Sequence, residues 1–308
     1  MSRRKKSLLV QRAEYALYRA VAWLARRPSD EGILKWGDRL GNFARRVLRR
    51  RDRLAMRNLR DTLRDKSEGE LREIANQCWR LFGREALISI RMQNMKLGEI
   101  ASRFEFVNVE ALENAIARGK GTLLISAHYG GWEAAGVALM SIVKNVRTVT
   151  RPLDNRFLAR DLLRFRSSTG AAVLDRKRAA RGILEVLSEN AVVVVLPDQA
   201  VLPREGVLVP FLGRPAWTTA VPAKMAIRRG SSIVFVFCIP HGSEHRLEFG
   251  DPIEVDQMTE AECDPVVLTR RINDVISTRI AAHPELWLWM HDRWKGTATG
   301  ESEGANGE

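Results

Sequence analysis

The chain is predicted to be an α/β protein with a mostly parallel sheet flanked by helices, preceded by a helical N-terminal region. From about residue 103, short apolar runs typical of strands alternate with helical stretches. Repeated strand–helix units of this kind form parallel sheets with right-handed crossovers. Before that point, residues 8–97 keep helical periodicity. The composition, 45% hydrophobic, is that of a globular protein with a sizeable core.

Each expected strand is a short run rich in apolar or β-branched residues, bounded by turn or helix signals. In chain order these runs are Phe104–Val107, Thr122–Ser126, Arg147–Thr150, Ala171–Leu174, Val192–Leu196, Ile233–Ile239 and Arg246–Phe249. The stretches between them have helical spacing and predict helices at Trp132–Val143, Arg156–Ser167, Ala179–Glu189, Ala220–Arg229 and Pro265–Ala282. Residues 206–219 are rich in glycine and proline and are expected to be a loop.

The chain is expected to fold as one continuous domain, because no Pro/Gly/Ser-rich linker interrupts residues 30–295. Within it, residues 1–100 form a helical membrane-associating region and residues 101–296 form the α/β core. Residues 297–308 contain no large apolar side chain and are expected to be a disordered tail.

The chain is strongly basic, with 50 Lys and Arg against 37 Asp and Glu, which gives a net charge of +13. Such a balance predicts anionic partners. Basic clusters at residues 3–6 and 45–53 flank or join amphipathic stretches, which favours an anionic membrane surface. No nucleic-acid-binding signature is present, so we expect no nucleic-acid partner. Residues 11–27 are too short and too charged for a typical span, and we interpret them as an interfacial helix.

The strongest candidate site follows the strand predicted over Thr122–Ser126, where the sequence reads TLLISAHYGGWE. His128 ends the apolar run, Gly130-Gly131 breaks it, and Glu133 opens the next helix. Within one helix, five positions would separate His128 and Glu133 by about 140°, whereas a turn lets their side chains converge. We expect Glu133 to hold one ring nitrogen while the other accepts a proton from a hydroxyl. The alternative is a histidine that only hydrogen-bonds within a loop.

Other familiar chemistries lack their signatures. The sequence contains no H-E-x-x-H, no G-x-S-x-G, no P-loop and no G-x-G-x-x-G. The three cysteines are scattered and share no metal-ligand spacing with the histidines, which indicates a reducing compartment and no metal site.

Further polar residues follow other predicted strands. Arg151 and Asn155 come after one strand, Arg176 after the next, and Asp198 and Gln199 after another. Because the carboxyl ends of parallel strands meet at one edge of a sheet, these side chains are expected to converge near His128. A base, carboxylates, guanidinium groups and amides together indicate a site for an anionic, hydroxylated ligand. For Asp198 the alternative is a cap on the following turn.

These motifs resemble the lysophospholipid acyltransferase superfamily, in particular its lipid A biosynthesis (lauroyl/myristoyl) late acyltransferase branch. The similarity rests on HYGGWE, the block at 170–176, LPDQ and residues 206–226, and it extends over residues 10–296. The resemblance implies a glycerolipid acyltransferase-like fold. One departure is Gly131, where the branch usually has asparagine.

The resemblance also implies roles for the candidate residues. His128 would deprotonate an acceptor hydroxyl and Glu133 would orient it. Arg176 would bind a phosphate, Arg151 and Asn155 would position substrate, and Asp198-Gln199 would shape the acceptor pocket. Those five are the candidate substrate-binding residues.

The implied activity is transfer of a fatty acyl chain from acyl carrier protein, or from acyl-CoA, to a hydroxyl of a lipid A precursor. No cofactor beyond the thioester co-substrate is expected. The location would be the cytoplasmic face of a bacterial inner membrane, with peripheral or monotopic attachment. Another lysophospholipid, a mannosylated phosphoinositide or an aminolipid are alternative acceptors. A basic membrane-binding protein that only retains the fold is the non-enzymatic alternative.

Overall fold

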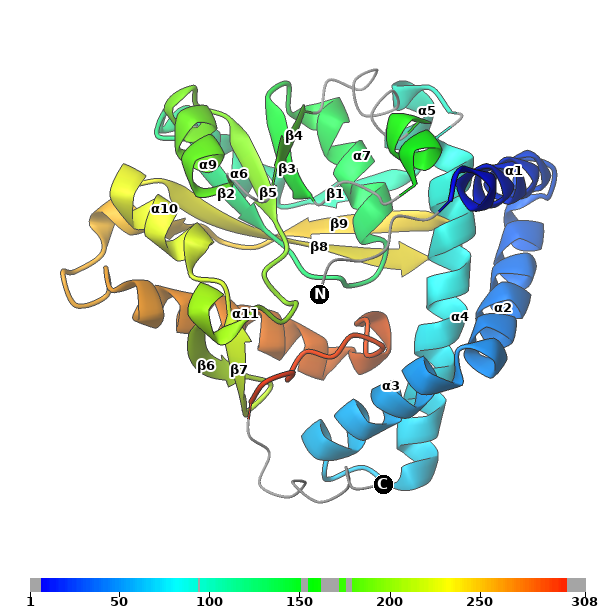
Figure 1. The fold of residues 1–308 in the computed structure, drawn as a ribbon. Helices are drawn as coiled ribbons and strands as arrows, with labels where there is room; N and C mark the ends of the chain where they lie inside the picture. The colour runs from blue at the N-terminus through cyan, green and yellow to red at the C-terminus, as the bar shows by residue number, and fades with distance from the viewer. Residues whose placement is uncertain (1–6, 94, 151–154, 162–171, 176–178, 298–308) are drawn as a thin grey trace.

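The computed structural model describes residues 7–93, 95–150, 155–161, 172–175 and 179–297. Within them, a twisted eight-stranded sheet forms the centre of the molecule (Figure 1). Its strands are β1 (Phe104–Val107), β2 (Thr122–Ile125), β3 (Val146–Thr150), β4 (Ala172–Asp175), β5 (Val192–Val195), β8 (Ser232–His241), β9 (Glu244–Phe249) and β10 (Ile253–Glu254). The strand order is β1-β9-β8-β2-β5-β3-β4, with β10 paired to β8.

The sheet is mostly parallel, as the sequence predicts. The β8–β9 and β8–β10 pairs are antiparallel, and the other pairs are parallel. All seven expected strands are present, with ends that shift by a few residues. β2 lies in the middle, between β8 and β5, and its four residues are fully buried. An apolar run without alternation is what such a doubly covered strand requires.

The prediction of a loop over residues 206–219 is wrong, because this stretch forms a hairpin of β6 (Val207–Phe211) and β7 (Arg214–Thr218). Pro210 and Pro215 lie opposite each other in it. A two-stranded ribbon tolerates proline because both of its strands are edges. The turn residues Leu212 and Gly213 have φ of 50° and 73°, as a tight hairpin turn requires.

Helices cover both faces of the sheet. In the N-terminal region they are α1 (Leu8–Leu24), α2 (Asp30–Val47), α3 (Arg49–Thr62), α4 (Glu68–Met92) and α5 (Leu97–Ala101). In the core they are α6 (Val109–Ala117), α7 (Trp132–Ile142), α9 (Ala179–Ser188), α10 (Val221–Arg229) and α11 (Pro265–Ala282). Residues 156–161 are also helical, so the start of the helix expected over Arg156–Ser167 is confirmed and its remainder lies outside the described residues.

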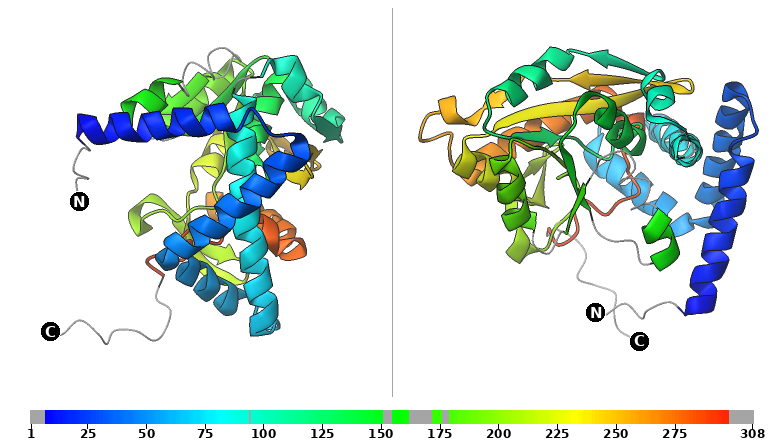
Figure 2. Two further views of the ribbon diagram at one scale, coloured as in Figure 1. Left: turned by 90° about the vertical axis from the view of Figure 1, so that its right-hand side faces the viewer. Right: turned by 90° about the horizontal axis from the view of Figure 1, so that it is seen from above.

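Alternate strand residues enter two separate cores. Leu123 and Ile125 of β2 pack with α9, α10, α11 and the C-terminal segment. Leu124 faces the opposite way and packs with α6, α7 and the second half of α4. The long helix α4 therefore contributes to both cores and runs down one side of the molecule beside α2 and α3, while α1 lies across its end (Figures 1 and 2). Among the helices that the structure describes, none combines the length and apolar character of a membrane-crossing segment.

The C-terminal segment after α11 carries three tryptophans, whose spacing in the sequence is compatible with core packing or with contact to a membrane surface. Trp287, Trp289 and Trp294 are at most 6% exposed, so they belong to the core. The buried amide of Asn58 in α3 donates hydrogen bonds to the carbonyls of Trp289 and His291 at 3.0 and 2.9 Å. These bonds fix the segment against the helical region.

Glycines allow α2 and α4 to touch backbone to backbone. A methyl group added at Gly41 would collide with the carbonyl of Trp79, and one at Gly83 with the carbonyl of Gly37. Gly41→Ala should therefore push the two helices apart and lower the free energy of unfolding by about 1–3 kcal/mol. Gly136→Ala in α7 is the matched control, because nothing lies within 4 Å of that position. The control should gain up to about 1 kcal/mol from helix propensity. Urea midpoints measure both, and equal values would contradict the close helix contact.

Candidate active site

His128 and Asp198 meet because they follow two neighbouring parallel strands in register. Ile125 at the end of β2 lies beside Val195 at the end of β5. His128 and Asp198 are each the third residue beyond these partners, so the strand ends deliver them to the same place. This is the edge at which an open parallel sheet places its ligands.

The carboxylate of Asp198 is fully engaged. Its Oδ1 lies 2.8 Å from Nδ1 of His128, and its Oδ2 accepts from the backbone N–H of His128 at 2.9 Å. Oδ2 also accepts from the indole Nε1 of Trp287 at 2.8 Å. Burial by itself would raise the pKa of Asp198, but the charge and hydrogen bonds of His128, with the bond from Trp287, lower it to about 2. The group is therefore a buried, ionised carboxylate at neutral pH.

This contact fixes the tautomer of His128. Because an ionised carboxylate only accepts hydrogen bonds, Nδ1 carries a proton and Nε2 of the neutral ring is the basic atom. Burial pulls the pKa of His128 down, but the Asp198 carboxylate outweighs it and raises this pKa above its ordinary value. Nε2 lies 3.0 Å from Nε2 of Gln199, which donates to it.

Glu133 does not make the contact that the sequence predicts. It lies in the first turn of α7 with an exposed side chain, and within the described residues Asp198, rather than Glu133, is bonded to Nδ1 of His128. The reason is topological: the strand β5 brings Asp198 against Nδ1 of the ring, whereas Glu133 comes after the Gly130-Gly131 turn, at the start of α7. Glu133 still adds to the rise in the pKa of His128 through its charge, as the smallest of the contributions.

The other predicted site residues fall into two groups. Asn155 is buried, donates to the carbonyl of Gln11 at 2.8 Å and to Glu14 at 3.0 Å, and accepts from the N–H groups of Phe157 and Leu158. These contacts cap the helix at residues 156–161 and tie it to α1, so they account for Asn155 without a substrate. Arg151 and Arg176 lie outside the described residues.

Sequence reasoning missed two residues of the site, both in the closing block HPELWLWMHDRWK. One is Trp287, whose indole N–H holds Asp198. The other is His291, whose Nε2 accepts from the backbone N–H of Ala200 at 3.3 Å. Burial lowers the pKa of His291, which keeps it a neutral acceptor. Their signal in the sequence is the density of tryptophan and histidine in this block, but only the fold shows that Trp287 reaches Asp198 and His291 reaches Ala200.

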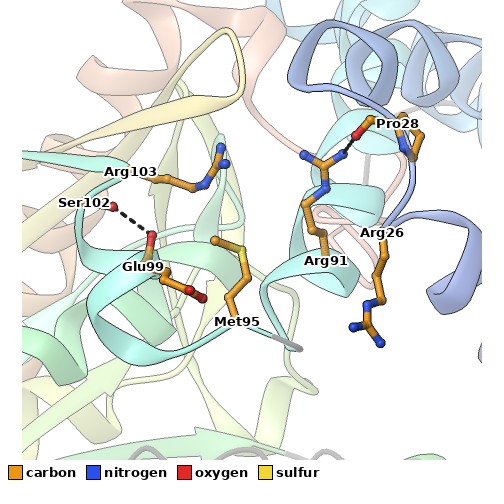
Figure 3. Close-up of a pocket in the computed structure, with 7 residues that line it drawn as sticks. All are labelled: Arg26, Pro28, Arg91, Met95, Glu99, Ser102 and Arg103. Atoms are coloured by element: carbon orange, nitrogen blue, oxygen red, sulfur yellow. Dashed lines mark hydrogen bonds between the residues drawn. The ribbon is translucent and has the colours of Figure 1, made fainter.

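A cavity of about 490 Å³ lies elsewhere, where the α1–α2 turn meets α4 and α5. Figure 3 shows its walls, where Arg91 donates to the carbonyl of Pro28. Arg91 and Arg103 also both donate to Asp30. It contains none of the predicted site residues. Within the described residues, no cluster of three or more His, Cys, Asp or Glu side chains is placed to bind a metal ion.

A histidine oriented by a buried carboxylate at the end of a central parallel strand defines a general-base site suited to group transfer onto a hydroxyl. The bacterial lipid A biosynthesis acyltransferase family model matches residues 1–296. The chain belongs to this family and is an acyltransferase, which sets aside the non-enzymatic alternative.

The curated relatives are named either phosphatidylinositol mannoside acyltransferases or lipid A biosynthesis acyltransferases. The chain is 27% identical over 209 residues to the phosphatidylinositol mannoside acyltransferase of Mycolicibacterium smegmatis, covering 67% of each chain. It is 26% identical over 280 residues to the lipid A biosynthesis lauroyltransferase of Escherichia coli, covering 89% of each chain. Among solved structures, the 1-acyl-sn-glycerophosphate (LPA) acyltransferase PlsC of Thermotoga maritima is 15% identical with a TM-score of 0.40, over 66% of this chain and 84% of that one.

Asp198→Asn should change the pH dependence of transfer as well as its rate. The base must be neutral to act, so wild-type activity falls as the pH drops below the raised pKa of His128. Without the carboxylate, burial lowers this pKa, and the acid limb of the profile should move to lower pH. An amide also permits the wrong tautomer, so kcat should fall by about 10²–10⁴.

Glu133→Gln is the comparison, and it should move the pKa of His128 less than Asp198→Asn does, because its charge contributes least. The measurement is the titration of the His128 ring by NMR together with kcat/KM against pH. A larger shift in the Glu133 variant would show that Glu133, not Asp198, supports the base.

Proposed function

We propose that this protein transfers a fatty acyl chain from a thioester, of acyl carrier protein or of CoA, to a hydroxyl of a lipid A precursor. The observation that carries the proposal is the buried Asp198 bonded to Nδ1 of His128, which leaves Nε2 as the base. The family match over residues 1–296 and the similarity to a lipid A lauroyltransferase support acyl transfer and the acceptor class.

The proposed reaction is a direct transfer. Nε2 of His128 takes the proton of the acceptor hydroxyl as its oxygen attacks the thioester carbonyl. The C–S bond then breaks, and the departing thiolate takes the proton back from the imidazolium. Asp198 stabilises that imidazolium, and general-base help of this kind contributes typically ~10²–10⁴ in rate. The reaction needs no cofactor beyond the thioester.

A mannosylated phosphoinositide is the second candidate acceptor, because the chain is also similar to phosphatidylinositol mannoside acyltransferases. Both acceptors are phosphorylated glycolipids that present a sugar hydroxyl, and the same base serves either. Lysophospholipids and aminolipids complete the set that an acceptor screen has to include. Arg176 and Arg151 remain the proposed phosphate and substrate contacts.

The acceptor is a lipid, so the protein has to reach a bilayer, and α2 provides a surface for it. Trp36, Leu40, Phe43 and Val47 repeat at helical spacing and are all exposed, next to the face of α2 that packs on α4. Exposed arginines follow them at Arg46, Arg49, Arg50 and Arg53. An apolar stripe with adjacent guanidinium groups suits the interface of an anionic membrane, at about 1 kcal/mol per basic residue.

The proposed place of action is the cytoplasmic face of a bacterial inner membrane, with peripheral or monotopic attachment. A thioester of acyl carrier protein would be delivered there, and the net charge of +13 would steer that acidic carrier toward the enzyme.

His128→Ala should abolish acyl transfer while vesicle binding persists, since the base lies apart from the α2 surface in the sequence and in the fold. Wild type and variant are each given lipid A precursor, or a mannosylated phosphoinositide, with mixed acyl-carrier and acyl-CoA donors. Mass spectrometry of the products reports a gain of one acyl chain. Full activity in the variant contradicts the mechanism; activity only on the phosphoinositide reassigns the acceptor.

Replacing Leu40, Phe43 and Val47 by serine should reduce binding to anionic vesicles, because each buries an apolar side chain in the interface. Val266→Ser/Val267→Ser is the control, since those side chains are comparably exposed at the start of α11. Vesicle sedimentation at rising ionic strength measures both effects, and residual binding should weaken with salt. If the control loses as much binding as the α2 variant, α2 is not the docking surface.

A further inference from the structure

We propose that Glu85 and His245 are positioning residues for the catalytic turn. They form a second carboxyl–imidazole pair, with His245 Nε2 2.9 Å from Glu85 Oε2. Glu85 comes from α4 and His245 from β9, and their side chains are 7% and 0% exposed. The pair takes no part in the proposed chemistry at His128. Its position next to the turn that follows His128 indicates a role in holding that turn.

The pair lies directly against the turn between His128 and Glu133. A Cβ built on Gly131 would stand 2.6 Å from Cδ2 and 2.7 Å from Nε2 of His245, and 2.7 Å from Oε2 of Glu85. The two side chains therefore fill the space that any side chain at residue 131 would need. This is why glycine is required there, although Gly131 has a negative φ.

Gly131 is also the N-cap of α7, the helix whose first turn carries Glu133. A typical N-cap side chain places an oxygen at the helix N-terminus, and glycine has none to offer. The carboxyl group of Glu85 reaches this point from another helix. A carboxyl oxygen at that end is favoured by the helix dipole. Glu85 thus brings a carboxyl group close to this helix end without forming a capping hydrogen bond.

His245 is held in place by contacts to its ring and to its backbone. Its ring stacks on Phe104, with centroids 5.0 Å apart and planes inclined by 15°. Its backbone N–H donates to the carbonyl of Arg103 at 2.9 Å. On the other side of the turn, Gly130 N donates to the carbonyl of Leu286 at 2.8 Å and Gly131 N to that of Cys238 at 3.4 Å. The turn is clamped between the pair and these carbonyls.

Stability alone is a poor explanation for the pair. Glu85 Oε1 and His245 Nδ1 are buried and have no hydrogen-bond partner in the described structure. Unsatisfied buried polar atoms are costly, and apolar side chains of similar size often replace a buried pair without loss. A role as a rigid, hydrogen-bonded support for the turn accounts for the presence of the Glu85–His245 pair. Since a displacement of about 1 Å can cost ~10² in rate, small movements of this turn matter for His128.

This inference rests on the proposed function, because the position that is maintained is that of His128 relative to the thioester. The first test is Glu85→Gln and His245→Ala, each checked for folding by its thermal midpoint. We expect kcat to fall about 10- to 100-fold with KM nearly unchanged, measured well below the midpoint. The control is Glu105→Gln, which removes a carboxylate from the exposed Glu105–Arg246 pair at the next position of β1 and β9, on the opposite face of the sheet. It should leave kcat unchanged.

A second readout does not depend on acyl transfer. Diethyl pyrocarbonate modifies neutral imidazole, and peptide mass spectrometry follows the modification rate of His128 without any lipid. This rate should change in the Glu85 and His245 variants and stay at the wild-type value in Glu105→Gln. If the proposed reaction were wrong, this readout would still report whether the pair positions His128.

The third test uses the shared space at residue 131. Gly131→Ala should lose activity because its methyl group meets both side chains, and Gly131→Ala/His245→Ala should recover part of it because the ring is gone. The double variant should thus exceed Gly131→Ala in kcat. Folded Glu85→Gln and His245→Ala proteins with wild-type kcat and wild-type His128 modification would overturn the inference. So would a fully active Gly131→Ala variant.

Discussion

The site depends on one buried carboxylate. Asp198 binds the backbone and the ring of His128 and the indole of Trp287, and with these three contacts it joins β5, the end of β2 and the C-terminal segment. A buried ionised group without partners would be very unfavourable, so these elements must come together for the carboxylate to be tolerated. The same requirement fixes the proton on Nδ1 and leaves Nε2 as the basic atom of the neutral ring. Folding and chemistry thus share one constraint.

The N-terminal helices take part in this arrangement. Asn58 of α3 fixes the segment that carries Trp287 and His291, and Glu85 of α4 lies under the turn after His128. The helical region that carries the exposed apolar stripe of α2 therefore also supports the site from two directions. Close packing of α2 on α4 through Gly41 and Gly83 makes the surface and the supports parts of one rigid unit.

Much of the core could be predicted because periodicity and strand order are local signals. The parallel strands and the convergence of His128 with Asp198 and Gln199 follow from where apolar runs end. The choice between Asp198 and Glu133 could not be predicted, because both are carboxylates near His128 and only the β2–β5 register decides which one is behind the ring. Trp287 is 89 positions from Asp198, and no spacing rule connects them. The β6–β7 hairpin could not be predicted because its prolines are typical of a loop.

The departure at Gly131 has a physical meaning that sequence alone could not provide. In the sequence, Gly131 stands at the start of a helix, where it provides no capping side chain. In the fold, the missing side chain is replaced by Glu85 and His245, which occupy its volume and bring a carboxyl group to the helix end. The two carboxyl–imidazole pairs then lie on either side of one short turn. In one of them the imidazole is open to a ligand, and in the other it is enclosed by the fold. The difference is access: His128 is 22% exposed and His245 is fully buried. We therefore assign chemistry to the Asp198–His128 pair at the sheet edge and positioning to the buried Glu85–His245 pair behind it.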